Sequence, residues 1–175
     1  MKLGIALFAA LVAVAPLNAG TPVAADPVMI NDANPASFQV YGVAAKPKTV
    51  VDDGVEGGRA LPVQVSGNGT PYAVGVNVPI TKAIKKGDKI TVYFWARLQG
   101  TGSASIASAQ LQLASAPYTK IFGEGVTITP AWKLFQVTGV ADAAYPKGTL
   151  NAAFHLNTGN HTVMMGAVAV LNAGQ

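Results

Sequence analysis

Alternation of apolar and polar side chains with a period of two is the sequence feature that most constrains the fold. In residues 90–98, Ile, Val, Phe, Ala and Leu occupy one face, and Thr, Tyr, Trp and Arg occupy the other. Residues 72–80, 106–113 and 150–156 show a similar alternation. Successive side chains of a β-strand point to opposite faces, so these segments are predicted to be strands with one buried face. The chain after Asp26 shows no sustained 3.6-residue apolar period of the kind that predicts amphipathic helices.

Turn signals divide the chain into eight or nine such segments. Shorter candidate strands are 38–43, 60–65, 127–128 with 132–140, and 162–171. They are separated by pairs and triplets rich in Gly, Asn and Asp, such as Gly67-Asn68-Gly69 and Lys86-Gly87-Asp88. This pattern predicts an all-β fold, an antiparallel β-sandwich of the jelly-roll type. We expect it to occupy residues 26–175 as one domain.

The first 25 residues have the pattern of a secretory signal peptide. Lys2 precedes an apolar run, Leu3–Ala15, that is too short for a transmembrane helix. Small residues precede two candidate cleavage sites, one before Gly20 and one before Asp26. The sequence therefore predicts a secreted or periplasmic protein without a membrane span. No Cys follows the apolar run, so a lipoprotein anchor is excluded.

Composition excludes several classes of protein. The chain has no Cys, which rules out disulfides, iron–sulfur clusters and zinc-thiolate sites. Its net charge is +4, but the 12 Lys and Arg residues are scattered, apart from a cluster between Lys82 and Lys89. Nucleic-acid binding needs a denser positive surface, so we expect no nucleic-acid partner.

Catalytic residues are poorly represented in the sequence. Asp52, Asp53 and Glu56 form the single acidic cluster, and they fall in a turn-rich segment. His155 and His161 lie near neither an acid nor a nucleophile motif, and no third metal ligand is apparent beside them. We interpret the acidic residues as solvated turn residues and predict that the protein is not an enzyme and needs no cofactor.

Neutral polar side chains on the outward strand faces indicate a sugar-binding site. Amide groups both donate and accept hydrogen bonds, which matches the dual capacity of a sugar hydroxyl. Ordinary solvent-facing strand positions are richer in Lys and Glu than these. The candidate ligand-binding residues are three tyrosines for ring stacking and three hydrogen-bonding side chains: Tyr41, Tyr72, Tyr118, Gln112, Asn151 and His155.

Several segments resemble the CenC-type carbohydrate-binding modules, the cellulose-binding jelly rolls of secreted glucanases. The resemblance lies in segments 69–76, 87–97, 116–118, 129–135 and 150–156, which occur in the family's order. It implies a non-catalytic domain that binds a β-glucan-like polysaccharide or oligosaccharide in a cleft, with secreted glycoside hydrolases as possible partners. The cleft tyrosines would be Tyr72 and Tyr118, and His155 occupies a position that often carries a glutamine.

One departure from the family concerns its structural calcium. The family usually has an acidic strand near the C-terminus, whereas residues 163–168 contain no acid. Calcium prefers several oxygen ligands, including carboxylates, so we expect no calcium at that place.

Two other classes of function stay open at this stage. An exported structural or adhesive β-sandwich could use the same neutral surface, with the Lys82–Lys89 cluster touching anionic polymers. A small carbohydrate-active enzyme could use Asp53 or Glu56. The positions of Trp95, as a sugar platform or under a loop, and of Trp132, in the core or at a sheet edge, are also open.

We predict that the exported protein begins at Asp26 or Gly20. Signal peptidases cleave after small residues, which precede both positions. Mass spectrometry of protein recovered outside the cytoplasm would measure the mature mass. An intact Met1 in that fraction would contradict the signal-peptide interpretation.

Overall fold

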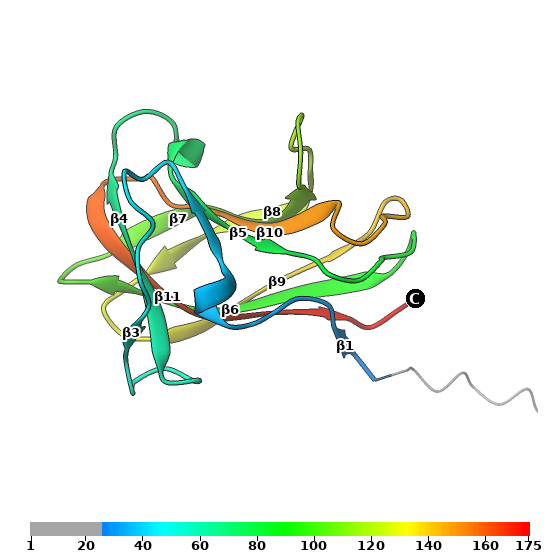
Figure 1. The fold of residues 1–175 in the computed structure, drawn as a ribbon, viewed down its shortest axis with the longest axis horizontal. Coiled ribbons are helices and arrows are strands. Elements are labelled where there is room, and N and C mark those ends of the chain that lie inside the picture. Colours follow the sequence, from blue (N-terminus) through cyan, green and yellow to red (C-terminus); the bar gives the residue numbers. More distant parts are fainter. Residues whose placement is uncertain (1–25) are drawn as a thin grey trace, which may run out of the picture.

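A computed structural model describes residues 26–175, and the predicted signal segment lies outside this range. Apart from two short 3-10 helices, the regular elements of the described residues are all strands (Figure 1). None of the helices in this range is long and apolar enough to cross a membrane. The elements are β1 (Val28–Met29), η1 (Pro35–Ser37), β2 (Gln39–Tyr41), β3 (Val50–Val51), β4 (Arg59–Ser66), η2 (Pro71–Ala73), β5 (Gly75–Pro79), β6 (Lys89–Gln99), β7 (Ala104–Leu113), β8 (Lys120–Ile128), β9 (Lys133–Val140), β10 (Leu150–His155) and β11 (Asn160–Asn172).

The strands form two antiparallel sheets packed face to face. Sheet one has the order β3-β4-β11-β6-β9, with β1 paired to β11. Sheet two has the order β2-β5-β10-β7-β8. Neighbouring strands are mostly distant in sequence, as in a jelly roll. The predicted all-β sandwich is therefore confirmed.

The core lies between the sheets and uses the inward face of each alternating strand. Ile90, Val92 and Phe94 of β6 are fully buried, as the alternation predicts. The Phe94 ring stacks on that of Phe135 of β9, with the ring centroids 5.2 Å apart. It meets the Phe154 ring of β10 edge-on, with the centroids 4.9 Å apart. These three aromatic rings join sheet one to the central strand of sheet two.

Strand β8 is longer than the sequence predicts. Only its end, residues 127–128, was expected, because Gly123 and Gly125 interrupt the apolar alternation. The strand stays paired to β7 through two irregularities of register. It also packs against β9, where a Cβ on Gly139 would lie 2.2 Å from the Phe122 ring. The missing side chain of Gly139 thus lets the edges of the two sheets meet.

The alternation predicted for residues 106–113 is wrong at its first residues. Ala107 was expected to face the core, but it is exposed and Ile106 is buried. A bulge between Ile106 and Ala109 explains the change, because an extra residue inverts the order of faces. From Ala109 onward the predicted faces are correct.

A loop between β3 and β4 covers part of the outer face of sheet one. Asp52 accepts hydrogen bonds from Arg97 at 3.0 Å and from the indole of Trp132 at 3.3 Å. Glu56 accepts one from the indole of Trp95 at 3.2 Å. These contacts hold both carboxylates on the face of sheet one that points away from sheet two.

Trp95 and Trp132 therefore lie beneath this loop, half-buried on the outer face of sheet one. The loop residue Val55 is buried above Gly166, where a Cβ would lie 2.7 Å from Val55 and 2.8 Å from Trp95. Gly166 falls in the acid-free segment 163–168. The side chains of Val55, Trp95 and Trp132 therefore pack over this part of the sheet.

We predict that Phe154→Ala lowers the free energy of unfolding by about 3–5 kcal/mol, because it leaves a cavity between the sheets. Denaturant unfolding would measure the change. Leu134→Ala serves as the control, since Leu134 is 45% exposed and its loss should cost about 0.5 kcal/mol or less. A loss at Phe154 no larger than that of the control would contradict the assigned core.

Candidate functional site

The outer face of sheet two carries rows of side chains set by the strand register. Directly opposed residues of antiparallel strands share a face. Gln112 of β7 opposes Asn151 of β10. One row further along, Gln110 of β7, Ala153 of β10, Asn77 of β5 and Gln39 of β2 follow one another across four strands.

The last row contains the ends of the same strands. Ser108 of β7 opposes His155 of β10, which opposes Gly75 of β5, which opposes Tyr41 of β2. Amides, one imidazole and one phenol thus gather over small residues at the centre of the sheet. This regular grid follows from the same period-two alternation that buries Phe154 on the other face.

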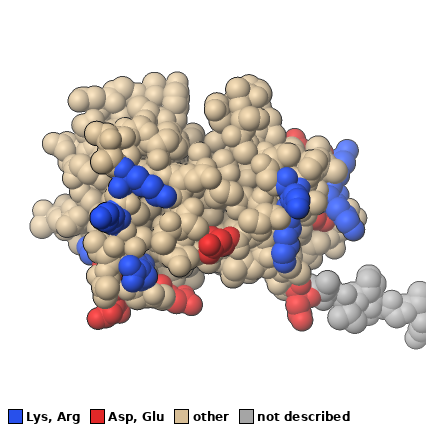
Figure 2. Space-filling model, in the orientation of Figure 1, with Lys and Arg blue, Asp and Glu red and all other residues tan. Residues whose placement is uncertain are grey.

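Two tyrosines outside the strands complete the sides of a cavity of about 640 Å³. Tyr72 lies in η2, before β5, and Tyr118 lies in the loop between β7 and β8. The predicted strand 72–80 therefore starts later than expected, at Gly75. Figure 2 shows a hollow between two projections at the top of the molecule, where Figure 1 places η2 and the β7–β8 loop.

The structure brings all six predicted ligand-binding residues to this one cavity. Its lining also includes residues that the prediction did not select. The predicted members are Tyr41, Tyr72, Gln112, Tyr118, Asn151 and His155, and the additional ones are Gln39, Asn77, Gln110, Ala114 and Pro117. Gln39 and Asn77 belong to strands whose outward positions could have indicated them, had the pairing of β2 with β5 been known.

The Tyr41 ring lies against the backbone at Gly75. A Cβ on Gly75 would come within 2.4 Å of the Tyr41 hydroxyl and equally close to the carbonyl oxygen of Phe154. Burial raises the pKa of the Tyr41 hydroxyl above 10.0. A glycine at this strand position leaves room for the ring on the cavity floor.

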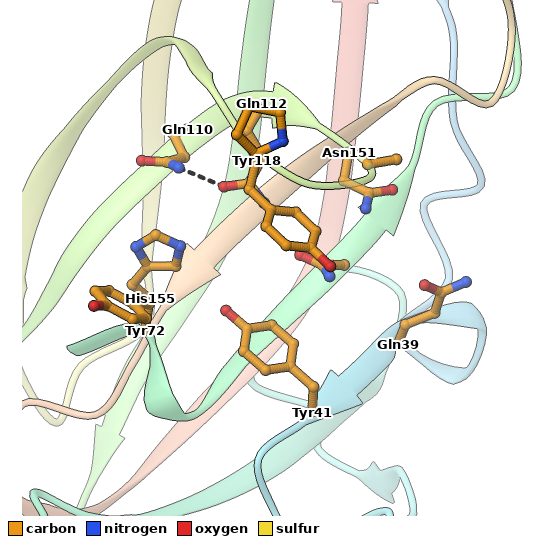
Figure 3. Close-up of a pocket in the computed structure, with 11 residues that line it drawn as sticks. Gln39, Tyr41, Tyr72, Gln110, Gln112, Tyr118, Asn151 and His155 are labelled. Carbon is orange, nitrogen blue, oxygen red and sulfur yellow. Dashed lines mark hydrogen bonds between the residues drawn. The ribbon is translucent and has the colours of Figure 1, made fainter. Parts of the chain in front are cut away.

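Tyr118 stands on a strained and exposed loop. Its φ of +54° is a left-handed conformation that costs a residue with a side chain roughly 1–2 kcal/mol. Hydrogen bonds within the loop hold it, from Tyr118 N to Ser115 O at 2.8 Å and from Leu113 N to Thr119 O at 3.0 Å. The side chain is 56% exposed, and its ring extends over the sheet toward the Tyr41 side (Figure 3). Such strain is commonly kept where a side chain has a functional position.

His155 is half-buried beside Tyr72, with the ring centroids 6.0 Å apart in an edge-on arrangement. Burial lowers the pKa of His155 below 6.5. The imidazole is therefore neutral at pH 7, with one nitrogen that donates and one that accepts a hydrogen bond.

Asn77 holds a buried acceptor without a partner. Its Oδ1 atom makes no hydrogen bond to any described residue, and the side chain lines the cavity. A buried polar atom left unpaired costs roughly 1–3 kcal/mol.

The lining of this cavity is electrically neutral. With His155 uncharged, none of its lining residues carries a formal charge at pH 7. On the face in Figure 2, the Lys, Arg, Asp and Glu side chains lie away from the hollow. Residues 26–175 contain no group of three or more His, Cys, Asp or Glu side chains placed to hold a metal ion.

The fold and the tyrosine- and amide-lined face define a jelly-roll β-sandwich of the kind found in carbohydrate-binding modules. Two cellulose-binding domains of Cellulomonas fimi β-1,4-glucanase C share this fold. The N-terminal domain is 22% identical over 79% of this chain and 90% of its own, with a TM-score of 0.57. The second N-terminal domain is 17% identical over 86% of this chain and 98% of its own, with a TM-score of 0.60.

A xylan-binding domain from Paenibacillus barcinonensis also has this fold. It is 9% identical over 89% of this chain and 99% of its own, with a TM-score of 0.58. No protein-family model and no curated protein sequence matches the chain. The sequence resemblance to CenC-type modules is thus confirmed at the level of the fold.

We predict that the free energy of unfolding decreases as the pH falls from 7 to 5. Burial lowers the folded-state pKa of His155 and of His161 below 6.5, so the unfolded chain binds more protons in this range. Asp52 does not contribute between pH 7 and 5, because it is ionised in both states there: its ordinary pKa of 3.8 is lowered in the folded protein, chiefly by the hydrogen bond from Arg97.

Urea unfolding at several pH values would measure this slope. The double variant His155→Gln/His161→Gln should show a flatter dependence on pH than the parent. An equal slope in the two proteins would show that other groups cause the effect.

Proposed function

We propose that this chain is an exported, non-catalytic carbohydrate-binding domain that holds a neutral polysaccharide of the β-glucan type in the cavity on sheet two. The observation that carries the proposal is the lining itself. Three tyrosines and five amide side chains meet in one uncharged cavity. Aromatic rings can cover the apolar faces of pyranose rings, and amides match their hydroxyls.

The cavity lies across the strands rather than along one of them. The lining comes from four neighbouring strands, β2, β5, β10 and β7, which at their usual spacing span about 14 Å, enough for more than one sugar ring in a row. The strand rows would place Gln112 and Asn151 on one side of the polysaccharide and His155 on the other. Water competes for each hydroxyl, so every contact is modest and affinity accumulates over several rings.

The arrangement of acidic residues supports binding without turnover. Hydrolysis of a glycosidic bond usually needs two carboxyl groups on either side of it. No carboxylate is among the described residues that line the cavity. Asp52 and Glu56 lie on sheet one, where Arg97 and the two tryptophans engage them. Delivery of secreted glycoside hydrolases to their substrate is the partner role that we propose for such a domain.

We predict that Tyr118→Ala and His155→Ala each weaken polysaccharide binding by about 1–3 kcal/mol, the size of a lost ring stack or polar contact. Affinity electrophoresis in gels with barley β-glucan, xylan, hydroxyethylcellulose or alginate would measure the retardation. Both variants should keep melting temperatures within a few degrees of the parent, since neither side chain belongs to the core.

Tyr93→Ala is a matched control. Tyr93 is half-buried on the outer face of sheet one, so its removal should leave retardation unchanged. Parental binding by both cavity variants would place the sugar site elsewhere. A parent that binds no glycan would favour the structural or adhesive alternative.

A further inference from the structure

A chain of hydrogen bonds runs along the outward face of β7. Ser108 Oγ donates to Gln110 Oε1 at 2.6 Å, and Gln110 Nε2 donates to Gln112 Oε1 at 2.5 Å (Figure 3 shows the second bond). The three residues are two apart in sequence, which places them on one side of the strand. Gln110 and Gln112 are both only 5% exposed, so water does little to satisfy their amides.

The direction of this chain determines what Gln112 offers to the cavity. An amide has one acceptor oxygen and one donor NH₂ group. The Gln112 oxygen is taken by Gln110, while its Nε2 atom bonds to no described residue and is not among the fully buried unpaired atoms. Because Gln112 lines the cavity, this NH₂ group is its free polar group there.

We propose that Ser108 is a positioning residue that holds this chain of hydrogen bonds in place, so that Gln112 presents its NH₂ group to the glycan as a hydrogen-bond donor. The inference deepens the proposed function and rests on it for the ligand. Ser108 itself is not among the residues that line the cavity. It acts through Gln110, whose own oxygen and nitrogen are both engaged within β7.

The opposite direction of the chain would use the same side chains with a different result. If both amides were rotated by half a turn, Gln112 would donate to Gln110 and would turn its carbonyl oxygen toward the ligand. Without the Ser108 hydroxyl, the buried Gln110 oxygen has no donor, and both amides lose the contact that holds their orientation. Because a hydroxyl can also accept a hydrogen bond, Ser108 would satisfy either direction. In the direction that the structure shows, Ser108 donates and Gln112 turns its NH₂ group toward the cavity.

The direction of the amide chain can be tested without a ligand. Side-chain NH₂ signals of the ¹⁵N-labelled protein should show one slowly exchanging proton on Gln110 and none on Gln112. Ser108→Ala and Gln112→Ala should each speed the exchange of the Gln110 proton. A protected proton on Gln112, or protection on neither glutamine, would overturn the proposal.

A double-mutant cycle tests whether Ser108 acts through Gln112. With barley β-glucan as the probe, Ser108→Ala should weaken binding about five- to tenfold, the effect of one hydrogen bond. In the Gln112→Ala background the same change should cost less than about twofold, and Ser108→Thr should restore nearly parental binding.

An equal loss in both backgrounds would overturn the role of Ser108, because it would then act independently of Gln112. A parent that is not retarded by barley β-glucan would instead count against the proposed ligand. In that case the exchange measurement on the free protein still decides the direction of the amide chain. A lower melting temperature is expected for Ser108→Ala, because the buried Gln110 oxygen loses its donor, whereas Ser108→Thr should keep the parental value.

Discussion

The contact of Phe154 with Phe94 across the two sheets is the interaction on which the rest of the structure depends. Phe154 lies on β10, the central strand of sheet two, between β5 and β7. Since the side chains of a strand alternate, burying Phe154 against sheet one turns its neighbour His155 toward the opposite face. The same register sets Gln110, Asn77 and Tyr41 around it. The core and the cavity thus lie on opposite faces of sheet two, and the same alternation of side chains sets both.

The two outer faces of the sandwich differ in what they leave available. On sheet one, the β3–β4 loop covers Trp95 and Trp132, and its Asp52 and Glu56 accept hydrogen bonds from the two indoles. On sheet two, the flanking loops stand apart, and the aromatic side chains between them remain partly exposed. The charged and indole groups therefore serve the stability of one face, while neutral amides and phenols line the other. This division is what makes sheet two the candidate binding face.

Pre-organisation distinguishes this lining from a merely solvated sheet surface. Tyr118 keeps a left-handed backbone, Tyr41 lies against the bare backbone of Gly75, and the β7 amides bind one another. Each feature restricts side chains that would otherwise be free. Groups that are already ordered lose less entropy when a ligand binds, so modest contacts with a polysaccharide can add up.

The sequence by itself determined the all-β class and most core residues of the long strands, and it supplied the six predicted ligand-binding residues that line the cavity. Period-two alternation indicates which side chains of a strand are buried, whereas Tyr72 and Tyr118, which lie outside the strands, were predicted from residue type and the family resemblance. The sequence could not predict most of β8, because its glycines interrupt the alternation. It also could not predict the inversion at Ala107, because that depends on a bulge in the pairing of β7 with β8.

Only the tertiary structure decided which strands are neighbours. The pairing of β2 with β5, and of β5 with β10, brought Gln39 and Asn77 into the cavity beside the predicted residues. It also separated Trp95 from the cavity by placing β6 in the other sheet. These outcomes depend on contacts between residues far apart in sequence, and an alternation read along one strand contains no information about its partners.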